Sequence, residues 1–278
     1  MTSVVQPKVP APVQAAPEIL TRDNFAKFKI RRASDMQWGV CMALYGAAGS
    51  GKSSLAASAA DSEDGSPLVF LDAEGGSRAI AHRDDIEVID VDSWKEIELF
   101  TRTAKSYSGF PWKTVVFDNM SEYLSMLNSL ITGDGEAPSQ PEWGKITLEF
   151  LSFIRTWRDL SKRGINVIFI AWEDEEKDDI GRVKHNLNFT PKIRKEFPGM
   201  IDIIGYLAVV DKSATHERLL DFSPSSRTAA KFRRSQTEAA LAIPFKIQYG
   251  IDKMPMSDIL KVLKGGGKWP DKKYTVKP

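Results

Sequence analysis

Short apolar runs alternate with longer amphipathic segments along the first two-thirds of the chain. The runs cover 40–44, 67–72, 86–91, 114–118 and 166–172, and most of them are continuous in apolar residues. A short, continuous apolar run is typical of a strand that is buried on both faces of a sheet. Between the runs, apolar residues recur at helical spacing in segments 93–107, 121–132 and 142–163. This alternation predicts an α/β fold with a mainly parallel, twisted sheet that carries helices on both faces.

The pattern changes after residue 173. A charged stretch extends to Lys195, and a further strand is expected at 203–210. Two short segments, 218–222 and 229–233, flank a Ser-Pro-Ser-Ser turn and predict a hairpin. We therefore expect the sheet to have an antiparallel C-terminal extension.

One glycine-rich stretch carries specific chemistry. It follows the first apolar run and fits the phosphate-loop pattern of glycine, four residues, then Gly-Lys-Ser. The expected nucleotide-binding residues are Gly46, Ala47, Ala48, Gly49, Ser50, Gly51, Lys52, Ser53 and Ser54. In such a loop, glycines let consecutive backbone N–H groups turn toward phosphate oxygens at the start of a helix. The stretch predicts a nucleoside triphosphate site in which Lys52 binds phosphate and Ser53 ligates Mg²⁺.

Two carboxylates end predicted strands downstream of this loop. Asp118 closes the run 114–118, where a strand next to the loop would deliver a metal ligand. Glu74 follows the run 67–72, and the carboxyl ends of strands line the ligand crevice of an open α/β sheet. We expect Asp118 to hold Mg²⁺ and Glu74 to activate the attacking water.

Two other classes of nucleotide-binding protein fit less well. Residues 72–75 also match the D-x-x-G element of switch GTPases, but the chain has no N-K-x-D or T-K-x-D guanine-binding motif. A small-molecule kinase would show a lid of clustered arginines. Between Asp118 and Trp172 the arginines are Arg155, Arg158 and Arg163, all in one expected helix. The missing guanine-binding motif argues against a GTPase, and a kinase remains a weaker alternative.

Composition excludes several classes of protein. The 278 residues are 42% hydrophobic and 27% charged, as in an ordinary globular protein. The single cysteine, Cys41, excludes an intramolecular disulfide and fits a cytoplasmic protein. No apolar segment reaches the ~20 residues of a membrane span, and the N-terminus lacks a signal-peptide pattern. The three histidines, His82, His185 and His216, show no metal-binding spacing.

The two ends of the chain differ from the middle. Residues 1–18 are rich in Pro, Ala and Val, which predicts a disordered leader. From residue 222 onward, twelve Lys and Arg stand against four Asp and Glu, although the whole chain has a net charge of +1. Such a region suits a nucleic-acid-facing surface and a solvated tail equally well. We expect three parts: the leader, a nucleotide-binding domain at 19–250, and a basic C-terminal helix with a loose tail at 251–278.

The order of these segments is similar to the core of the RecA and RadA recombinases. The shared segments are GAAGSGKSS, VFLDAEGG, TVVFDN and NVIFIAWE, within about residues 38–235, and the DAE ending is the most telling after the phosphate loop. The chain most resembles the phage-encoded RecA-like ATPases of the Sak type. The resemblance implies a RecA-like P-loop core that hydrolyses ATP with Mg²⁺ as a homo-oligomeric ring or filament. It also implies action on single-stranded DNA together with single-strand-binding proteins.

The same resemblance assigns roles to single residues. Lys52 and Ser53 would hold phosphate and Mg²⁺, Asp118 would be the acidic strand-end residue, and Glu74 would activate water. Lys231 and Arg233 look like the cations that RecA-type oligomers direct into a neighbouring nucleotide site, since residues i and i+2 of a strand project from the same side. The alternative for this pair is a basic edge strand that limits aggregation.

The loop expected after Trp172 is the candidate for contact with DNA. There the resembled family has a glutamine that senses the γ-phosphate, whereas this chain has Ala171, Trp172 and Glu173. The loop starts acidic and then becomes basic, at Arg182, Lys184, Lys192, Arg194 and Lys195. Binding of single strands needs cations along the backbone and planar groups for stacking. Trp172 would stack on a base or simply pack, and a solvated loop of mixed charge is the alternative reading.

Together these features predict a Mg²⁺-dependent ATPase that acts on single-stranded DNA in phage recombination or strand annealing. Two alternatives stay open: an ATPase whose nucleotide state controls assembly or signalling without DNA, and a P-loop kinase.

Overall fold

The computed structural model describes residues 38–276 except 107–108, 134–136, 178, 211–216, 251 and 272, together with Phe28, Ile30 and Arg32. The chain divides into two compact units, Met1–Met36 and Gln37–Pro278. In the first unit the three described residues are exposed. The expected leader 1–18 and His216 lie outside the described residues.

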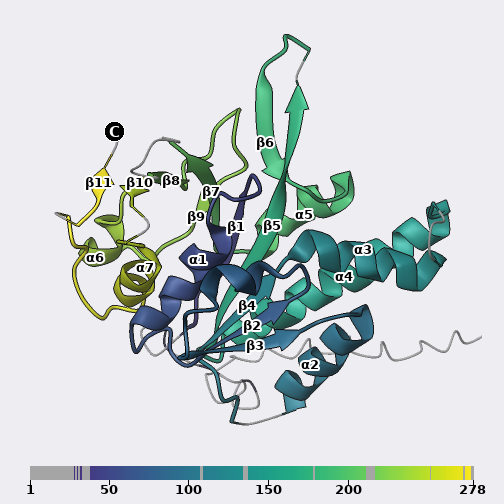
Figure 1. Cartoon of the computed structure of the whole chain (residues 1–278), viewed down its shortest axis with the longest axis horizontal. Helices are drawn as coiled ribbons and strands as arrows, with labels where there is room; N and C mark the ends of the chain where they lie inside the picture. The colour runs from purple at the N-terminus through teal and green to yellow at the C-terminus, as the bar shows by residue number, and fades with distance from the viewer. Residues whose placement is uncertain are drawn as a thin grey trace, which may run out of the picture. The chain divides into compact units, whose positions relative to one another are not determined.

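The second unit is built on one mixed sheet with helices packed against it (Figure 1). Its strands are β1 (Cys41–Gly46), β2 (Leu68–Asp72), β3 (Ile86–Asp90), β4 (Thr114–Asp118), β5 (Asn166–Lys177), β6 (Val183–Leu187), β7 (Ile203–Val209), β8 (Arg218–Asp221), β9 (Lys231–Phe232), β10 (Lys246–Tyr249) and β11 (Thr275–Val276). Its helices are α1 (Lys52–Ala57), α2 (Trp94–Ser106), α3 (Met120–Thr132), α4 (Gln140–Ser161), α5 (Pro191–Met200), α6 (Glu238–Leu241) and α7 (Met256–Leu263), with short 3₁₀ helices η3 (Ser58–Asp61) and η4 (Gly76–Ile80). No described helix is long and apolar enough to cross a membrane.

The strands follow the spatial order β11-β10-β8-β7-β1-β5-β4-β2-β3. The strands from β7 to β3 in this order are parallel to one another. Strands β8 and β9 pair antiparallel with β7, and β10 and β11 continue the antiparallel part. The predicted parallel sheet with an antiparallel C-terminal extension is therefore confirmed.

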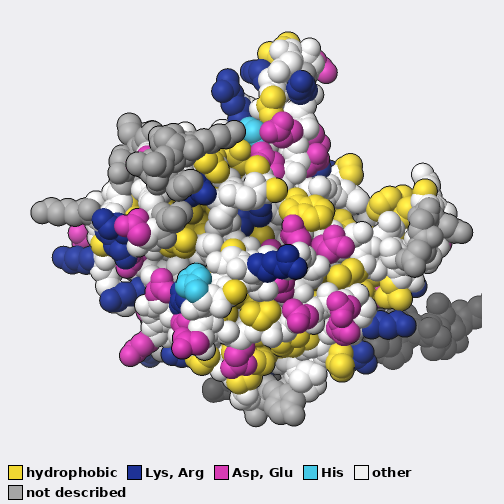
Figure 2. Space-filling model, in the orientation of Figure 1, with side chains coloured by type: hydrophobic (Ala, Val, Ile, Leu, Met, Phe, Trp, Pro, Cys, Tyr) yellow, Lys and Arg dark blue, Asp and Glu magenta, His cyan; other side chains and the backbone are white. Residues whose placement is uncertain are grey.

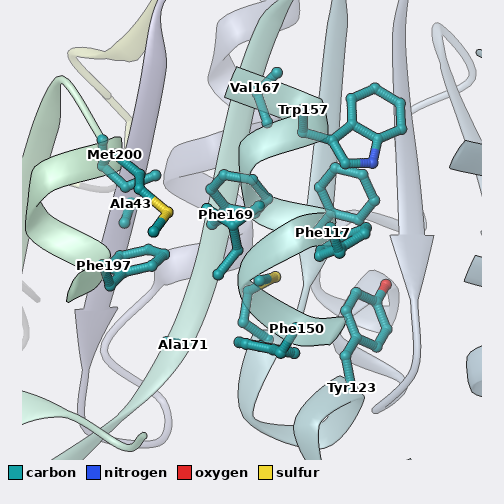
Figure 3. Packing of buried hydrophobic residues seen from close by; sticks show 14 of the residues in the cluster. Ala43, Phe117, Tyr123, Phe150, Trp157, Val167, Phe169, Ala171, Phe197 and Met200 are labelled. Atoms are coloured by element: carbon teal, nitrogen blue, oxygen red, sulfur yellow. The ribbon is translucent and has the colours of Figure 1, made fainter. Parts of the chain in front are cut away.

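Alternating residues of the central strands face two separate cores. On one face, Ala43, Phe117 and Phe169 pack with apolar residues of α2, α3, α4 and α5 (Figure 3). On the other face, Met42 and Ile168 pack with α1, η3 and α7. The ring of Trp157 from α4 lies 4.9 Å from the ring of Phe117, centre to centre. The sheet thus has helices on both faces, as predicted, and Phe150, Phe153 and Trp157 of segment 142–163 belong to the core.

The predicted hairpin of 218–222 with 229–233 is wrong, because both segments pair with β7. Strand β8 lies along Tyr206–Val209, and β9 lies beside Ile203 and Ile204. The two short strands thus occupy successive stretches of the same edge of the longer β7, whose other edge is taken by β1.

The loop expected after Trp172 is also different. Strand β5 continues as far as Lys177 and pairs antiparallel with β6, so the stretch forms a hairpin that projects beyond the sheet (Figure 1). In the register of this hairpin, Glu176 lies opposite Lys184 and Glu175 opposite His185. Opposite charges across a strand pair favour pairing, which explains how a highly charged segment forms strands.

The C-terminal tail packs onto the sheet rather than remaining loose. Strand β11 pairs with β10, and Trp269 and Tyr274 are only 4% and 5% exposed. The Tyr274 hydroxyl donates to Asp258 Oδ2 of α7 at 2.6 Å. The burial of two large aromatic rings accounts for the ordering of this segment.

Candidate functional site

The phosphate loop lies beside a cavity of about 740 Å³ at the carboxyl ends of the parallel strands. The loop leaves β1 at Gly46 and enters α1 at Lys52. Gly49 and Gly51 have positive φ angles, 72° and 95°. A residue with a Cβ atom adopts such an angle only at a cost in free energy. This explains why glycine suits both positions, of which Gly51 is a fixed position of the motif and Gly49 is not.

Lys52 is folded back onto its own loop. Its Nζ donates hydrogen bonds to the carbonyl oxygens of Gly46 and Ala47, both at 2.9 Å, and the residue is buried. Burial lowers the pKa of Lys52, and the charges of Asp118, Glu74 and Glu173 oppose this shift. The ammonium group is thus held at the loop with carboxylates near it.

Ser53 and Asp118 meet at one end of the cavity. The Ser53 hydroxyl donates to Asp118 Oδ2 at 2.5 Å. We predicted that Asp118 would lie on the strand next to the one that leads into the phosphate loop. This is wrong, because β5 lies between β1, which leads into the loop, and β4, which ends in Asp118. Since both strands end at the same edge of the sheet, Asp118 still reaches the loop. Burial raises the pKa of Asp118 to about 6; the Ser53 hydrogen bond and the charge of Lys52 oppose the rise, whereas the charges of Asp72 and Glu74 add to it.

A glycine backbone covers this serine–aspartate pair. A Cβ atom on Gly76 would lie 2.6 Å from Asp118 Oδ2 and 3.1 Å from Ser53 Oγ. The loop that follows β2 therefore lies directly against Asp118 Oδ2 and Ser53 Oγ. It can do so because glycine at position 76 has no side chain. Paired hydroxyl and carboxylate oxygens suit a hard divalent cation, so Ser53 and Asp118 fit the Mg²⁺ expected from the sequence.

Asp72 shapes the loop that carries Glu74. Its Oδ1 accepts hydrogen bonds from the backbone N–H groups of Glu74, Gly75 and Gly76 at 3.1, 2.8 and 3.1 Å. Its Oδ2 accepts from the Ser77 N–H at 2.8 Å. Burial raises the pKa of Asp72. The hydrogen bonds from Ser77, Glu74 and Gly75 lower this pKa by a larger amount, so the net shift is downward. Asp72 is therefore an anchor of this loop.

The side chain of Glu74 is oriented by two donors. Trp172 Nε1 donates to both carboxylate oxygens at 3.1 Å, and Asn119 Nδ2 donates to Oε2. The Oδ1 atom of Asn119 meanwhile accepts from the Glu122 N–H at 2.9 Å and caps α3. Trp172 therefore lines the cavity as a hydrogen-bond donor. Sequence reasoning missed Asn119, although an asparagine directly before a helical segment is a typical capping signal.

A family of AAA domains, AAA_24, matches residues 39–234. The match covers more than half of the chain and includes the phosphate loop, Glu74, Asp118 and Trp172. The chain belongs to this family. Among solved structures it is similar to the RadB recombinase, with 14% identity over 69% of this chain and 84% of that chain and a TM-score of 0.43. It is also similar to a KaiC-like protein from the hyperthermophilic archaeon Pyrococcus horikoshii OT3, with 16% identity over 76% and 85% and a TM-score of 0.40. No curated protein sequence matches the chain.

The antiparallel extension of the sheet and the segment after β10 also line the cavity, which the sequence did not indicate. Arg218, Tyr249, Asp252 and Met254 form part of its wall. Arg218 Nε donates to the Ser50 carbonyl oxygen of the phosphate loop at 2.9 Å. Their role depends on where β8 and β10 lie in the sheet, and no local motif marks that position.

The structure places Lys231 and Arg233 in different environments. Lys231 Nζ donates to the carbonyl oxygens of Pro198 and Ile201, at 2.5 and 2.6 Å, at the end of α5. The Arg233 side chain is 62% exposed and lies 3.4 Å from Asp202. Lys231 is thus engaged within its own AAA domain, whereas Arg233 faces solvent.

The five basic residues considered for DNA contact also separate into two groups. Arg182 and Lys184 belong to the outer part of the β5–β6 hairpin, and Lys192 and Lys195 are exposed on α5. Arg194 is instead packed against the base of the hairpin. It donates to Asp174 at 2.5 Å, to the Phe189 carbonyl at 3.0 Å and to Glu176. Two carboxylates therefore neutralise Arg194 in the structure.

A second group of titratable side chains lies at the hairpin base. Ligand atoms of Glu173, Glu175 and His185 lie within 4.8 Å of one another. His185 Nδ1 bonds to Glu173, and the Tyr206 hydroxyl donates to Glu173 Oε1 at 3.1 Å. The rings of His185 and Tyr206 are stacked, with centres 4.9 Å apart. These internal contacts account for the cluster and tie β6 to β7.

Proposed function

We propose that this AAA-domain protein is a Mg²⁺-dependent, RecA-like ATPase that acts on single-stranded DNA in phage recombination or strand annealing. The observation that carries the hydrolytic part is the convergence of Lys52, the Ser53–Asp118 pair and Glu74 on one cavity. An ammonium, a pair of oxygen ligands and a carboxylate are the groups that phosphoryl transfer to water requires.

In the proposed reaction, the N–H groups of the phosphate loop and Lys52 bind the triphosphate. Phosphate oxygens replace the two carbonyl oxygens that now accept hydrogen bonds from Lys52. Ser53 and Asp118 would hold Mg²⁺, which would place a positive charge next to the phosphate oxygens. The backbone of Gly76 lies beside the Ser53 and Asp118 oxygens and restricts their movement.

Glu74 takes the role of the base in this proposal. Its carboxylate lies at the cavity and accepts a proton from the water that attacks the γ-phosphate, and ADP leaves. Trp172 and Asn119 hold the carboxylate in one direction. A base that is fixed by two donors loses less entropy on reaction than a freely rotating one.

The hairpin and α5 are the proposed surface for single-stranded DNA. Figure 2 shows Lys and Arg side chains together with an acidic side chain on the outer part of the hairpin, and further Asp and Glu side chains nearer its base. Together with the exposed Lys192 and Lys195, these cations suit the phosphate backbone of a nucleic acid. Phage origin, single-strand-binding partners and a homo-oligomeric state follow from the resemblance to Sak-type ATPases. In such an oligomer, the exposed Arg233 is the proposed contact with the neighbouring subunit's site.

The first test concerns nucleotide chemistry. We expect the wild type to bind Mg·ATP and hydrolyse it, Lys52→Ala to lose binding, and Glu74→Gln to bind ATP normally but lose most of its turnover. Glutamine preserves the shape of Glu74 but cannot accept the proton. If calorimetry detected no binding of Mg·ATP by the wild type, the proposal would be wrong. Transfer of phosphate to a metabolite instead of water would favour the kinase alternative.

The second test concerns DNA. A variant with Lys184, Lys192 and Lys195 changed to Ala should bind single strands more weakly and show a smaller salt dependence, by about two in the slope for three phosphate contacts. The matched control is a triple alanine variant at the exposed Lys95 of α2, Lys145 of α4 and Lys162 directly after α4, none of which belongs to the hairpin or to α5. Absence of any affinity of the wild type at low salt would refute DNA binding and favour nucleotide-controlled assembly.

A further inference from the structure

We infer that Arg218 is a phosphate ligand supplied in cis to the nucleotide site by the antiparallel extension of the sheet. This inference rests on the proposed function, since it concerns the same cavity, and it adds a residue that lies far from the phosphate-loop motif in sequence. The ligand class is a nucleoside di- or triphosphate, with Arg218 bound to its phosphate chain.

The position of Arg218 is fixed by the sheet. It is the first residue of β8, paired with Val209 of β7 on one side and with Tyr249 of β10 on the other. Residues directly opposite in an antiparallel pair project from the same face. Arg218 and Tyr249 accordingly line the same cavity as the phosphate loop.

Arg218 approaches the loop at the Ser50–Gly51 peptide. Its Nε–H donates to the Ser50 carbonyl oxygen at 2.9 Å, and a Cβ atom on Gly51 would lie 3.5 Å from the same nitrogen. A guanidinium group carries five N–H donors in a planar fork. The bond from Nε therefore fixes the plane of the group beside the loop whose N–H groups bind phosphate, and a planar fork suits phosphate oxygens.

The surrounding groups support a ligand at this corner. Tyr249 is 4% exposed, and its phenol oxygen has no hydrogen-bond partner among the described residues. Burial raises the pKa of Tyr249, so the phenol stays a neutral donor. A buried hydroxyl without a partner is uncommon in a folded protein, and here it lines a cavity beside a cation. Another cavity-lining arginine, Arg83, forms ion pairs with Asp61 and Asp85.

The test measures the affinity of Arg218 variants for Mg·ATP, Mg·ADP and tripolyphosphate by calorimetry. Arg218→Ala should weaken all three by about tenfold to a hundredfold, as expected for loss of a charged hydrogen bond. Arg218→Gln can still donate to Ser50 but carries no charge, so it should bind as weakly as Arg218→Ala, whereas Arg218→Lys should recover part of the affinity. Arg227→Ala, an exposed position on the same extension, is the control and should bind like the wild type. Melting temperatures without nucleotide show whether each variant folds.

A mixing experiment shows whether Arg218 acts within its own chain. Lys52→Ala subunits carry an intact Arg218, so they would restore turnover to Arg218→Ala subunits if the arginine acted across an interface. We expect no recovery.

Three results would overturn the inference alone: wild-type affinity in Arg218→Gln, recovery of turnover on mixing, or an effect on ATP and ADP without one on tripolyphosphate. Failure of the wild type to bind any of the three ligands would instead overturn the proposed function and this inference together.

Discussion

Adding one methyl group to Gly76 should damage the metal site without removing any of its ligands. The new Cβ of Gly76→Ala would lie 2.6 Å from Asp118 Oδ2, so the carboxylate must retreat by about 0.8 Å to reach an ordinary contact of 3.4 Å. The same oxygen accepts the Ser53 hydroxyl at 2.5 Å, and a shift of that size away from Ser53 would lengthen this hydrogen bond to about 3.3 Å and weaken it. Overpacking of this kind costs about 1–3 kcal/mol.

The neighbouring glycine provides a matched control. Gly75 has a φ of 81°, and a Cβ there would meet only Arg78 Nε, at 3.9 Å. Gly75→Ala should therefore cost a similar amount, about 1–2 kcal/mol, through backbone strain, while leaving Asp118 in place. The two variants are comparable in stability but differ in what they do to the serine–aspartate pair.

The assay is ATP turnover as a function of Mg²⁺ concentration, combined with chemical unfolding of both variants. We expect Gly76→Ala to need about tenfold more Mg²⁺ for half-maximal turnover, which corresponds to about 1.4 kcal/mol of lost metal binding. Gly75→Ala should keep the wild-type Mg²⁺ dependence. The reasoning is refuted if Gly76→Ala keeps the wild-type dependence, or if both variants shift it equally.

Three further predictions concern the groups around Glu74. Trp172→Phe keeps an aromatic ring but removes the donor to Glu74, so kcat should fall severalfold while the affinity for ATP, measured by calorimetry, stays unchanged. Asn119→Asp keeps the oxygen that caps α3 but places a negative charge against Glu74; turnover should fall more than in Trp172→Phe, with the helical circular-dichroism signal retained. Asp72→Asn should reduce the free energy of unfolding at pH 7 by about 1–2 kcal/mol, because its amide cannot accept all four N–H groups. The folded-state pKa of Asp72 is lowered, so its charge stabilises the fold above the unfolded pKa of about 4 and loses this effect as the pH falls through the folded value. The difference between wild type and Asp72→Asn in urea unfolding should therefore shrink in acid; a difference that is constant with pH would contradict this reasoning.

Local patterns were sufficient for the parallel half of the sheet. A strand buried on both faces has no polar alternation, and the apolar runs at 67–72 and 114–118 coincide with β2 and β4. The spacing of the phosphate loop also predicted the position of Lys52 and Ser53, because backbone curvature and the helix start follow from the glycines themselves.

The partners of the short strands could not be predicted in the same way. Strand β9 pairs with the part of β7 that β8 leaves unpaired. The length of that part is known only once the sheet is assembled. The hairpin after Trp172 has alternating charges that look like a solvated loop until Glu176 and Lys184 are placed opposite each other. Arg218 belongs to the same class, since its proximity to Ser50 exists only because β8 lies beside β7.

The end of β5 contacts both the cavity and the hairpin. The resembled RecA-like family has a glutamine there, whereas this chain has Ala171, Trp172 and Glu173. In the structure, the indole N–H donates to Glu74 at 3.1 Å, so a donor is still present at this position. Since side chains alternate along a strand, the next residue, Glu173, faces the other side and bonds to His185 at the hairpin base. Two consecutive residues of one strand thus contact the cavity and the hairpin, with no flexible loop between them.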